Sequence, residues 1–290
     1  MSFPPRPELH CLGVAKLEFD SLPFSLTGCS VAGMMTWIAL EPWSIGFDCG
    51  LVTPQLVKCG TLIITHGHMD HAGGLGTWLA MRRLNGLGPS RVFAPAEICE
   101  VLERIVEQWE RMHRNPFDWT LTPMQPGDRV ELSPKLVVEA LPSDHVVPTR
   151  AWAIYQQHSK LKPALRGLDG PAINAIKRKG EAVNEVTWKP MFAITGDSRA
   201  TTIEREPVFT QAAVACVECT FLDEKCPVDR ARKGGHTHLD ELIDIPWKNR
   251  FVVPYHISQR YNLSQAKALF QQKWAPHLPP GVQLVPMLPA

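Results

Sequence analysis

The chain has 290 residues, which is enough for one large domain or two small ones with a buried core. Apolar residues make up 44% and charged residues 20% of it, as in ordinary globular proteins, and 30 Lys and Arg against 29 Asp and Glu give a net charge of +1. This balance excludes a protein that binds nucleic acid through its overall charge, but it leaves room for a local basic patch.

The eight cysteines are too few for a disulfide-stabilised scaffold, and residues 1–9 lack the charged and then apolar pattern of an export signal. We therefore expect reduced thiols and a cytoplasmic protein. The uncharged stretch 21–40 has the length of a membrane span, but Pro23, Gly28 and repeated Ser and Thr interrupt it. Two short strands joined by a turn explain it better, and we expect no membrane-spanning segment.

Five short runs of apolar and β-branched residues each lead into a histidine or an acidic residue. Runs of this length and composition are typical of buried strands. Polar side chains just past several strand ends are typical of an α/β protein whose site lies along one edge of a sheet. The runs are 61–65 before His66, 136–141 before His145, 191–195 before Asp197, 212–217 before Glu218 and 251–255 before His256.

Helices are expected between these strands. Residues 72–83 follow the first histidines directly, residues 97–113 follow Pro95, and residues 264–273 follow the last apolar run. In 97–113 the apolar side chains recur at helical spacing, which predicts one stripe of an amphipathic helix. The stripe consists of Ile98, Val101, Leu102, Ile105, Trp109 and Met112.

Residues 160–180 differ from the rest of the chain. They hold six basic residues against one acidic residue, together with several glycines and prolines. We expect a projecting basic arm there. The predicted organisation is a single domain over 1–290 with this arm inserted at about 158–186.

The strongest chemical signal is the run His66-Gly-His68-Met-Asp70-His71. Three imidazoles and a carboxylate within six residues each need a hydrogen-bond or metal partner when they are buried. Alternation puts His66 and His68 on one side, while Asp70 and His71 turn towards a second position. The arrangement suits two adjacent cations with the nitrogen and oxygen ligands that zinc prefers.

This motif, followed by Ala-Gly-Gly-Leu at 72–75, resembles the metallo-β-lactamase superfamily of hydrolases. The resemblance implies an α/β fold, a four-layer αβ/βα sandwich, with a dinuclear metal site at the sheet edges. Three later segments resemble the ribonuclease Z (tRNase Z) branch. They are His-Ile-Ser-Gln-Arg-Tyr at 256–261, Glu-Cys-Thr-Phe at 218–221 with Gly-His-Thr at 235–237, and the Gly-Pro and basic stretch within 167–180, which is similar to the branch's tRNA-gripping arm.

The resemblance implies two zinc ions, with manganese or iron as alternatives. It assigns His66, His68 and His145 to the first ion, Asp70, His71 and His256 to the second, and Asp197 to both. It also implies attack on phosphorus by a hydroxide that the ions hold, with Asp70 orienting that hydroxide or accepting its proton.

Departure of the 3′ oxygen needs an acid, for which we expect His236, held by Glu218. His238, two residues further on, is the alternative, and the Gly-Gly before His236 favours the former. Phosphate contacts are expected from Ser258, Arg260, Lys177, Arg178 and Lys179, although the run 177–179 is by itself more typical of a solvated face. Cys216 and Cys219 are interpreted as buried strand thiols.

The leading hypothesis is a zinc-dependent endoribonuclease that removes the 3′ trailer of precursor tRNA and acts as a homodimer. The alternatives are a phosphodiesterase of small substrates such as cyclic nucleotides, and a hydrolase of non-phosphate substrates. One departure from the family pattern concerns the fifteen residues 51–65. They are too few for a helix of normal length and the strand before His66.

Overall fold

The computed structural model describes residues 13–289, so the expectation for residues 1–9 lies outside the described residues. Its strands form two seven-stranded sheets. The first sheet contains, in spatial and chain order, Ala15–Glu18 (β1), Ser25–Val31 (β2), Met35–Glu41 (β3), Ile45–Phe47 (β4), Thr61–Ile63 (β5), Ser90–Pro95 (β6) and Trp119–Met124 (β7). Its first four strands are antiparallel, and the strands from β4 to β7 are parallel.

The second sheet repeats this plan. It contains Arg129–Ser133 (β8), Leu136–Pro142 (β9), Arg150–Leu161 (β10), Asn184–Ile194 (β11), Val214–Glu218 (β12), Phe251–Tyr255 (β13) and Gln283–Leu284 (β14). The strands from β8 to β11 are antiparallel, and those from β11 to β14 are parallel. In both sheets the parallel strands end at the edge where the histidines follow.

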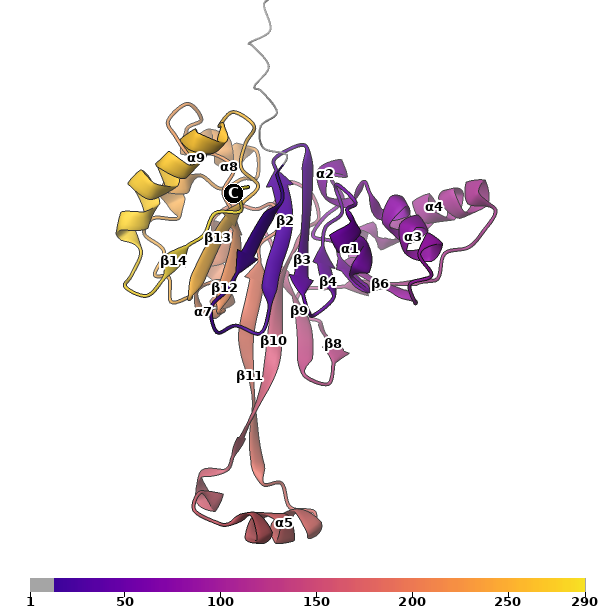
Figure 1. Ribbon diagram of the computed structural model, residues 1–290. Helices are drawn as coiled ribbons and strands as arrows, with labels where there is room; N and C mark the ends of the chain where they lie inside the picture. Colours follow the sequence, from indigo (N-terminus) through magenta and orange to yellow (C-terminus); the bar gives the residue numbers. More distant parts are fainter. Residues whose placement is uncertain (1–12, 290) are drawn as a thin grey trace, which may run out of the picture.

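Helices cover the outer face of each sheet (Figure 1). Those beside the first sheet are Pro54–Lys58 (α1), Met69–Ala72 (α2), Leu75–Leu84 (α3) and Ala96–His113 (α4). Those beside the second are Thr201–Arg205 (α6), Val208–Gln211 (α7), Val228–Lys233 (α8) and Leu263–Leu269 (α9). The remaining helix Gly170–Arg178 (α5) and the single turns Pro163–Leu165 (η1), Leu239–Glu241 (η2), Phe270–Trp274 (η3) and Ala275–His277 (η4) complete the described elements.

Three hydrophobic clusters define four layers. In β3, Ile38 and Leu40 point into the cluster between the two sheets, whereas Trp37 and Ala39 point into the cluster shared with α1 to α4. A third cluster lies between the second sheet and its helices. This alternation follows from the two-residue period of a strand that is buried on both faces. The expected four-layer αβ/βα sandwich is confirmed.

Most of the expected elements are present. The stretch 21–40 forms β2 and most of β3 joined by a turn, and no helix within residues 13–289 is both long and apolar enough to cross a membrane. The segment 51–65 accommodates a helix of only five residues, α1, before β5. The helix expected at 72–83 is interrupted: α2 ends at Ala72 and α3 begins at Leu75. Gly74 between them packs so closely that a Cβ would lie 2.2 Å from the carbonyl oxygen of Cys49.

The stripe predicted for α4 is partly wrong. Its buried side chains are Cys99, Leu102 and Val106, whereas Val101, Ile105 and Met112 are exposed by 56%, 42% and 71%. The apolar residues of this helix are spaced so that either of two overlapping faces could be the buried one. Packing against α3 and the first sheet selects the face that carries Cys99.

The basic arm projects from the second sheet. Strand β10 pairs with β9 up to Gln156, and beyond that residue it pairs with β11 alone, from Gln157 opposite Trp188 to Leu161 opposite Asn184. We call residues 157–188 the arm. Figure 1 shows these two strands running away from both sheets and carrying α5 at the far end. That the whole chain is one domain stays a prediction.

Candidate metal centre

The side chains expected at strand ends lie at one end of the two sheets. They come from both sheets: His66 follows β5, His145 lies between β9 and β10, Asp197 follows β11, Glu218 ends β12 and His256 follows β13. All except His145 are no more than 2% exposed. Segments that are far apart in the sequence thus deliver a compact cluster of imidazoles and carboxylates.

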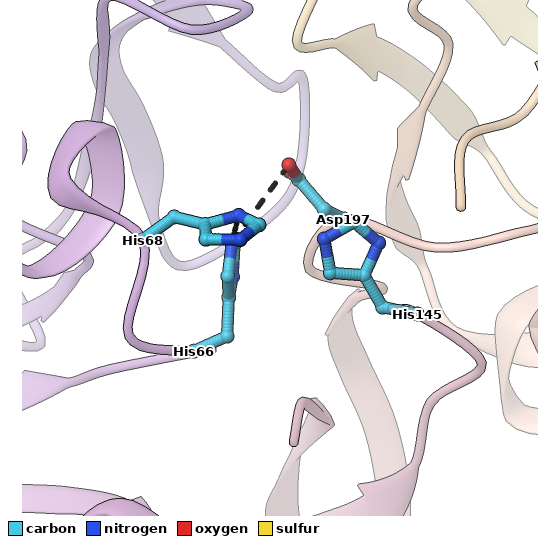
Figure 2. A group of neighbouring side chains, drawn as sticks. All are labelled: His66, His68, His145 and Asp197. Carbon is cyan, nitrogen blue, oxygen red and sulfur yellow. Dashed lines mark hydrogen bonds and ion pairs between the residues drawn. The ribbon is translucent and has the colours of Figure 1, made fainter. Parts of the chain in front are cut away.

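One group in this cluster consists of His66, His68, His145 and Asp197. One nitrogen or oxygen of each lies within 4.8 Å of those of the others. Nε2 of His66 is 3.0 Å from Nδ1 of His68 and 3.8 Å from Oδ2 of Asp197. Figure 2 shows the four side chains pointing towards a common centre. This is the set that the family resemblance assigns to a first metal ion.

A second group consists of Asp70, His71 and His256, again with ligand atoms within 4.8 Å of one another. Oδ2 of Asp70 is 3.7 Å from Nε2 of His71 and 3.5 Å from Nε2 of His256. Asp197 lies between the groups, because its two carboxylate oxygens are 3.2 Å from Nε2 of His71 and 3.2 Å from Nε2 of His256. The geometry therefore contains two adjacent donor sets that share one carboxylate.

The donor atoms themselves fit a bound cation. Four buried atoms of these groups lack a well-directed hydrogen bond, although all but Nε2 of His145 lie 3.2 Å from another member of the cluster: Nε2 of His71, His145 and His256, and Oδ1 of Asp197. Each buried polar atom without a partner costs about 1–3 kcal/mol. A metal ion bound by these atoms would remove that cost, and imidazole and carboxylate together are a donor set that suits zinc.

The other ring nitrogen of each histidine is held by the protein. Nδ1 of His66 lies 3.0 Å from the hydroxyl of Thr65, and Nδ1 of His71 lies 2.7 Å from Asp48. Nδ1 of His145 lies 2.8 Å from the carbonyl oxygen of Gly235, and Nδ1 of His256 lies 3.0 Å from the hydroxyl of Thr220. Metal-binding histidines are oriented in this way, with the second nitrogen donating to an acceptor. Nε2 therefore faces the cluster in all four rings.

The electrostatics favour positive charge on His71 and His256, whereas burial lowers the pKa of His66 and His145. Burial lowers the pKa of His256, but Asp197 and Asp70 outweigh it and raise this pKa to about 9. Burial likewise lowers the pKa of His71, but Asp197 and Asp48 raise it well above its usual value. Without a metal ion, protons on these rings balance the carboxylates. Metal binding is therefore expected to release protons.

Asp48 is a site residue that the sequence analysis missed. Its buried carboxylate accepts from the backbone amide and the hydroxyl of Thr65, and it lies 2.7 Å from Nδ1 of His71. The signal was available, because Asp48 directly follows β4 in the same way that the other site residues follow their strands. Its partner could not be read from the sequence, since the contact depends on how the segment after β4 packs against α2.

Glu218 and His236 form a pair beside the second group. Nδ1 of His236 is 3.0 Å from Oε1 of Glu218, whose other oxygen accepts from the backbone amide of Thr237. Glu218 is fully buried, and Asp197, His236 and His256 form a third set within 4.8 Å. His238, in contrast, accepts from the amide of Asp240 at the start of η2 and is thereby part of a helix cap.

The expected phosphate contacts lie at different distances from this centre. Arg260 is exposed, and its guanidinium carbon is 5.7 Å from the ring centre of Phe221. The ring of Phe221 in turn lies 6.2 Å from that of His236. Ser258, two residues before Arg260 in the chain, is half-buried. The basic residues 177–179 are exposed at the end of α5 and belong to the arm. Cys216 and Cys219 are buried free thiols, as expected.

Fold and site together define a metal-dependent hydrolase of the β-lactamase superfamily. Residues 48–257 match the β-lactamase superfamily domain. Among solved structures, a metallo-β-lactamase fold protein of Bacillus subtilis matches with a TM-score of 0.57 and 13% identity over 96% of both chains. The short form of human tRNase Z matches with a TM-score of 0.54 and 16% identity over 95% of both chains, which supports the fold.

Curated relatives narrow the class. A chloroplastic tRNase Z of Arabidopsis thaliana is 31% identical over 87% of this chain and 72% of its own length. A second tRNase Z of that plant is 29% identical over 83% of this chain and 88% of its own length. A nuclear ribonuclease Z of Triticum aestivum is 33% identical over 60% of this chain and 100% of its own length. The chain belongs to the tRNase Z family, which confirms the resemblance found in the sequence.

Proposed function

We propose that this protein is a zinc-dependent endoribonuclease that removes the 3′ trailer of precursor tRNA. The observation that carries the proposal is the pair of donor sets sharing Asp197, with the Glu218–His236 pair beside them. Relatives named tRNase Z support the choice of substrate. A hydrolase of neutral substrates has no use for the phosphate contacts expected from Arg260 and the basic arm.

His66, His68 and His145 would hold the first zinc ion, and Asp70, His71 and His256 the second, with Asp197 shared. Zinc supplies Lewis acidity to a phosphoryl oxygen and activates water at neutral pH. Asp70 is 13% exposed, whereas His71 and His256 beside it are buried, so its carboxylate can orient the attacking water. Thus one residue both binds metal and positions the nucleophile.

Proton transfer to the departing 3′ oxygen is assigned to His236. Burial lowers its pKa, but the hydrogen bond and the charge of Glu218 outweigh burial and raise this pKa above its usual value. The ring is 23% exposed, so Nε2 can reach a substrate while Nδ1 stays on Glu218. Arg260, above Phe221, would bind a phosphate that neighbours the cleaved one.

The basic arm is proposed to bind the tRNA body. Replacing Lys177, Arg178 and Lys179 together by serine should weaken binding of precursor tRNA. The slope of log Kd against log salt concentration should also become smaller, by up to about three, because each lost phosphate contact lowers it by about one. Hydrolysis of bis-p-nitrophenyl phosphate should be unchanged, because a small diester does not span the distance to the arm. The variant would argue against the proposal if its salt dependence equalled that of the wild type.

Parallel assays on precursor tRNA, bis-p-nitrophenyl phosphate and a cyclic nucleotide test the proposed function. We expect precise removal of the trailer. If precursor tRNA is untouched by enzyme that hydrolyses the small diesters well, the phosphodiesterase alternative replaces the proposal.

A homodimer is proposed as the active assembly. Apolar side chains left exposed along α3, the loop after it and α4 support this, since exposed apolar surface is often part of an interface. These side chains are Met81, Leu84, Leu87, Val101, Ile105 and Met112. Sedimentation at micromolar concentration distinguishes a dimer from a monomer. A cytoplasmic location stays a prediction.

A further inference from the structure

The hydroxyl of Thr220 lies at the junction of the site. This residue belongs to the Glu-Cys-Thr-Phe segment at 218–221. Its side chain is 3% exposed. Oγ1 is 3.0 Å from Nδ1 of His256, 3.0 Å from the carbonyl oxygen of His256 and 3.5 Å from Nδ1 of His236, and it is hydrogen-bonded to Oε1 of Glu218.

The single hydroxyl hydrogen has two acceptors within reach, the Glu218 carboxylate and the His256 carbonyl oxygen. An ionised carboxylate forms the stronger bond, so the hydroxyl donates to Glu218. Its oxygen is then an acceptor for the N–H at Nδ1 of His256. In the neutral ring this leaves the lone pair on Nε2 of His256, the nitrogen that faces Asp70 and Asp197, which is the tautomer that a metal ion needs.

Glu218 cannot hold His256 by itself. Oε1 of Glu218 lies 3.7 Å from Nδ1 of His256, which is beyond hydrogen-bond distance, and it already accepts from His236. The hydroxyl of Thr220 bridges this gap. The backbone of His256 also has a positive φ of 62°, a conformation that costs energy and must be held by its surroundings.

We propose that Thr220 is a positioning residue that fixes the tautomer of His256 and links the second proposed zinc position to the Glu218–His236 pair. The inference rests on the proposed zinc site. It predicts that the hydroxyl, and not the methyl group, of Thr220 is needed for tight binding of one of two ions. Valine removes the hydroxyl with little change of shape, and serine keeps the hydroxyl.

The test compares T220V and T220S with the wild type and with a matched control, T61V. Thr61 is also 3% exposed, and its hydroxyl accepts from Arg91 at the start of β5, at the opposite end of that strand from His66. Affinity for Zn²⁺ is measured by titration of the metal-free protein against a chromogenic chelator. Thermal melting of the metal-free proteins shows whether T220V and T61V are destabilised alike.

We expect T220V to bind the weaker of two zinc ions about 10- to 100-fold less tightly, while T220S stays within a few-fold of the wild type and T61V is unchanged. Equal zinc affinity in T220V and T61V would overturn the inference. Failure of the wild type to bind two zinc ions would instead overturn the proposed function. If T220V does not fold, the pair T220A and T220S makes the same comparison.

Discussion

Replacing Asp197 by asparagine is expected to lower kcat on precursor tRNA by about a thousandfold and to reduce the zinc content below two ions per chain. Asp197 is 2% exposed and contacts His66, His71 and His256. The amide keeps the shape of the side chain but loses the negative charge that both donor sets share. Elemental analysis of gel-filtered protein and kcat of the same sample measure the two effects.

D128N is the control for this substitution. Asp128 is exposed in the turn before β8, where its carboxylate accepts from the amide of Gln125, and an asparagine oxygen can do the same. This variant should keep its zinc and its activity. Wild-type zinc content and activity in D197N would contradict the assignment of Asp197 to both ions.

The second large effect is expected for His236→Ala. Loss of a general acid lowers kcat by about 10²–10⁴-fold. Glu218 raises the pKa of His236 above its usual value, which favours the protonated ring, and wild-type activity should therefore fall as the pH rises through that pKa. H236A should lose this alkaline fall in its pH profile of kcat while it keeps two zinc ions.

The leaving group separates proton donation from metal binding. A p-nitrophenolate departs without protonation, so H236A should lose far less activity on bis-p-nitrophenyl phosphate than on precursor tRNA. H238N is the neighbouring control, because asparagine is a good helix cap and His238 caps η2. Equal losses on both substrates in H236A would assign His236 to metal binding, in keeping with its place near Asp197 and His256.

The sequence was sufficient to predict the fold and the cluster of polar side chains. Buried parallel strands are short apolar runs, and the residues at their ends meet at one sheet edge whatever the details of packing. His66, Asp197 and His256 could therefore be grouped although they lie far apart in the chain. The family motifs then ordered them into two donor sets.

Contacts that depend on register could not be predicted in the same way. Asp48 reaches His71 because the segment after β4 pairs with α2 through the amide of Cys49 and the carbonyl oxygen of His71. Thr220 reaches His256 because β12 pairs with β13. Neither pairing leaves a signal at those positions in the sequence. The buried face of α4 was also mispredicted, because its apolar residues fit two faces and tertiary packing chose between them.

Anomalous X-ray scattering at the zinc edge, recorded from crystals of the zinc-loaded protein, tests the central claim most directly. The account predicts two peaks, one among His66, His68 and His145 and the other among Asp70, His71 and His256, with Asp197 next to both. A single peak, or zinc bound elsewhere on the chain, would contradict it.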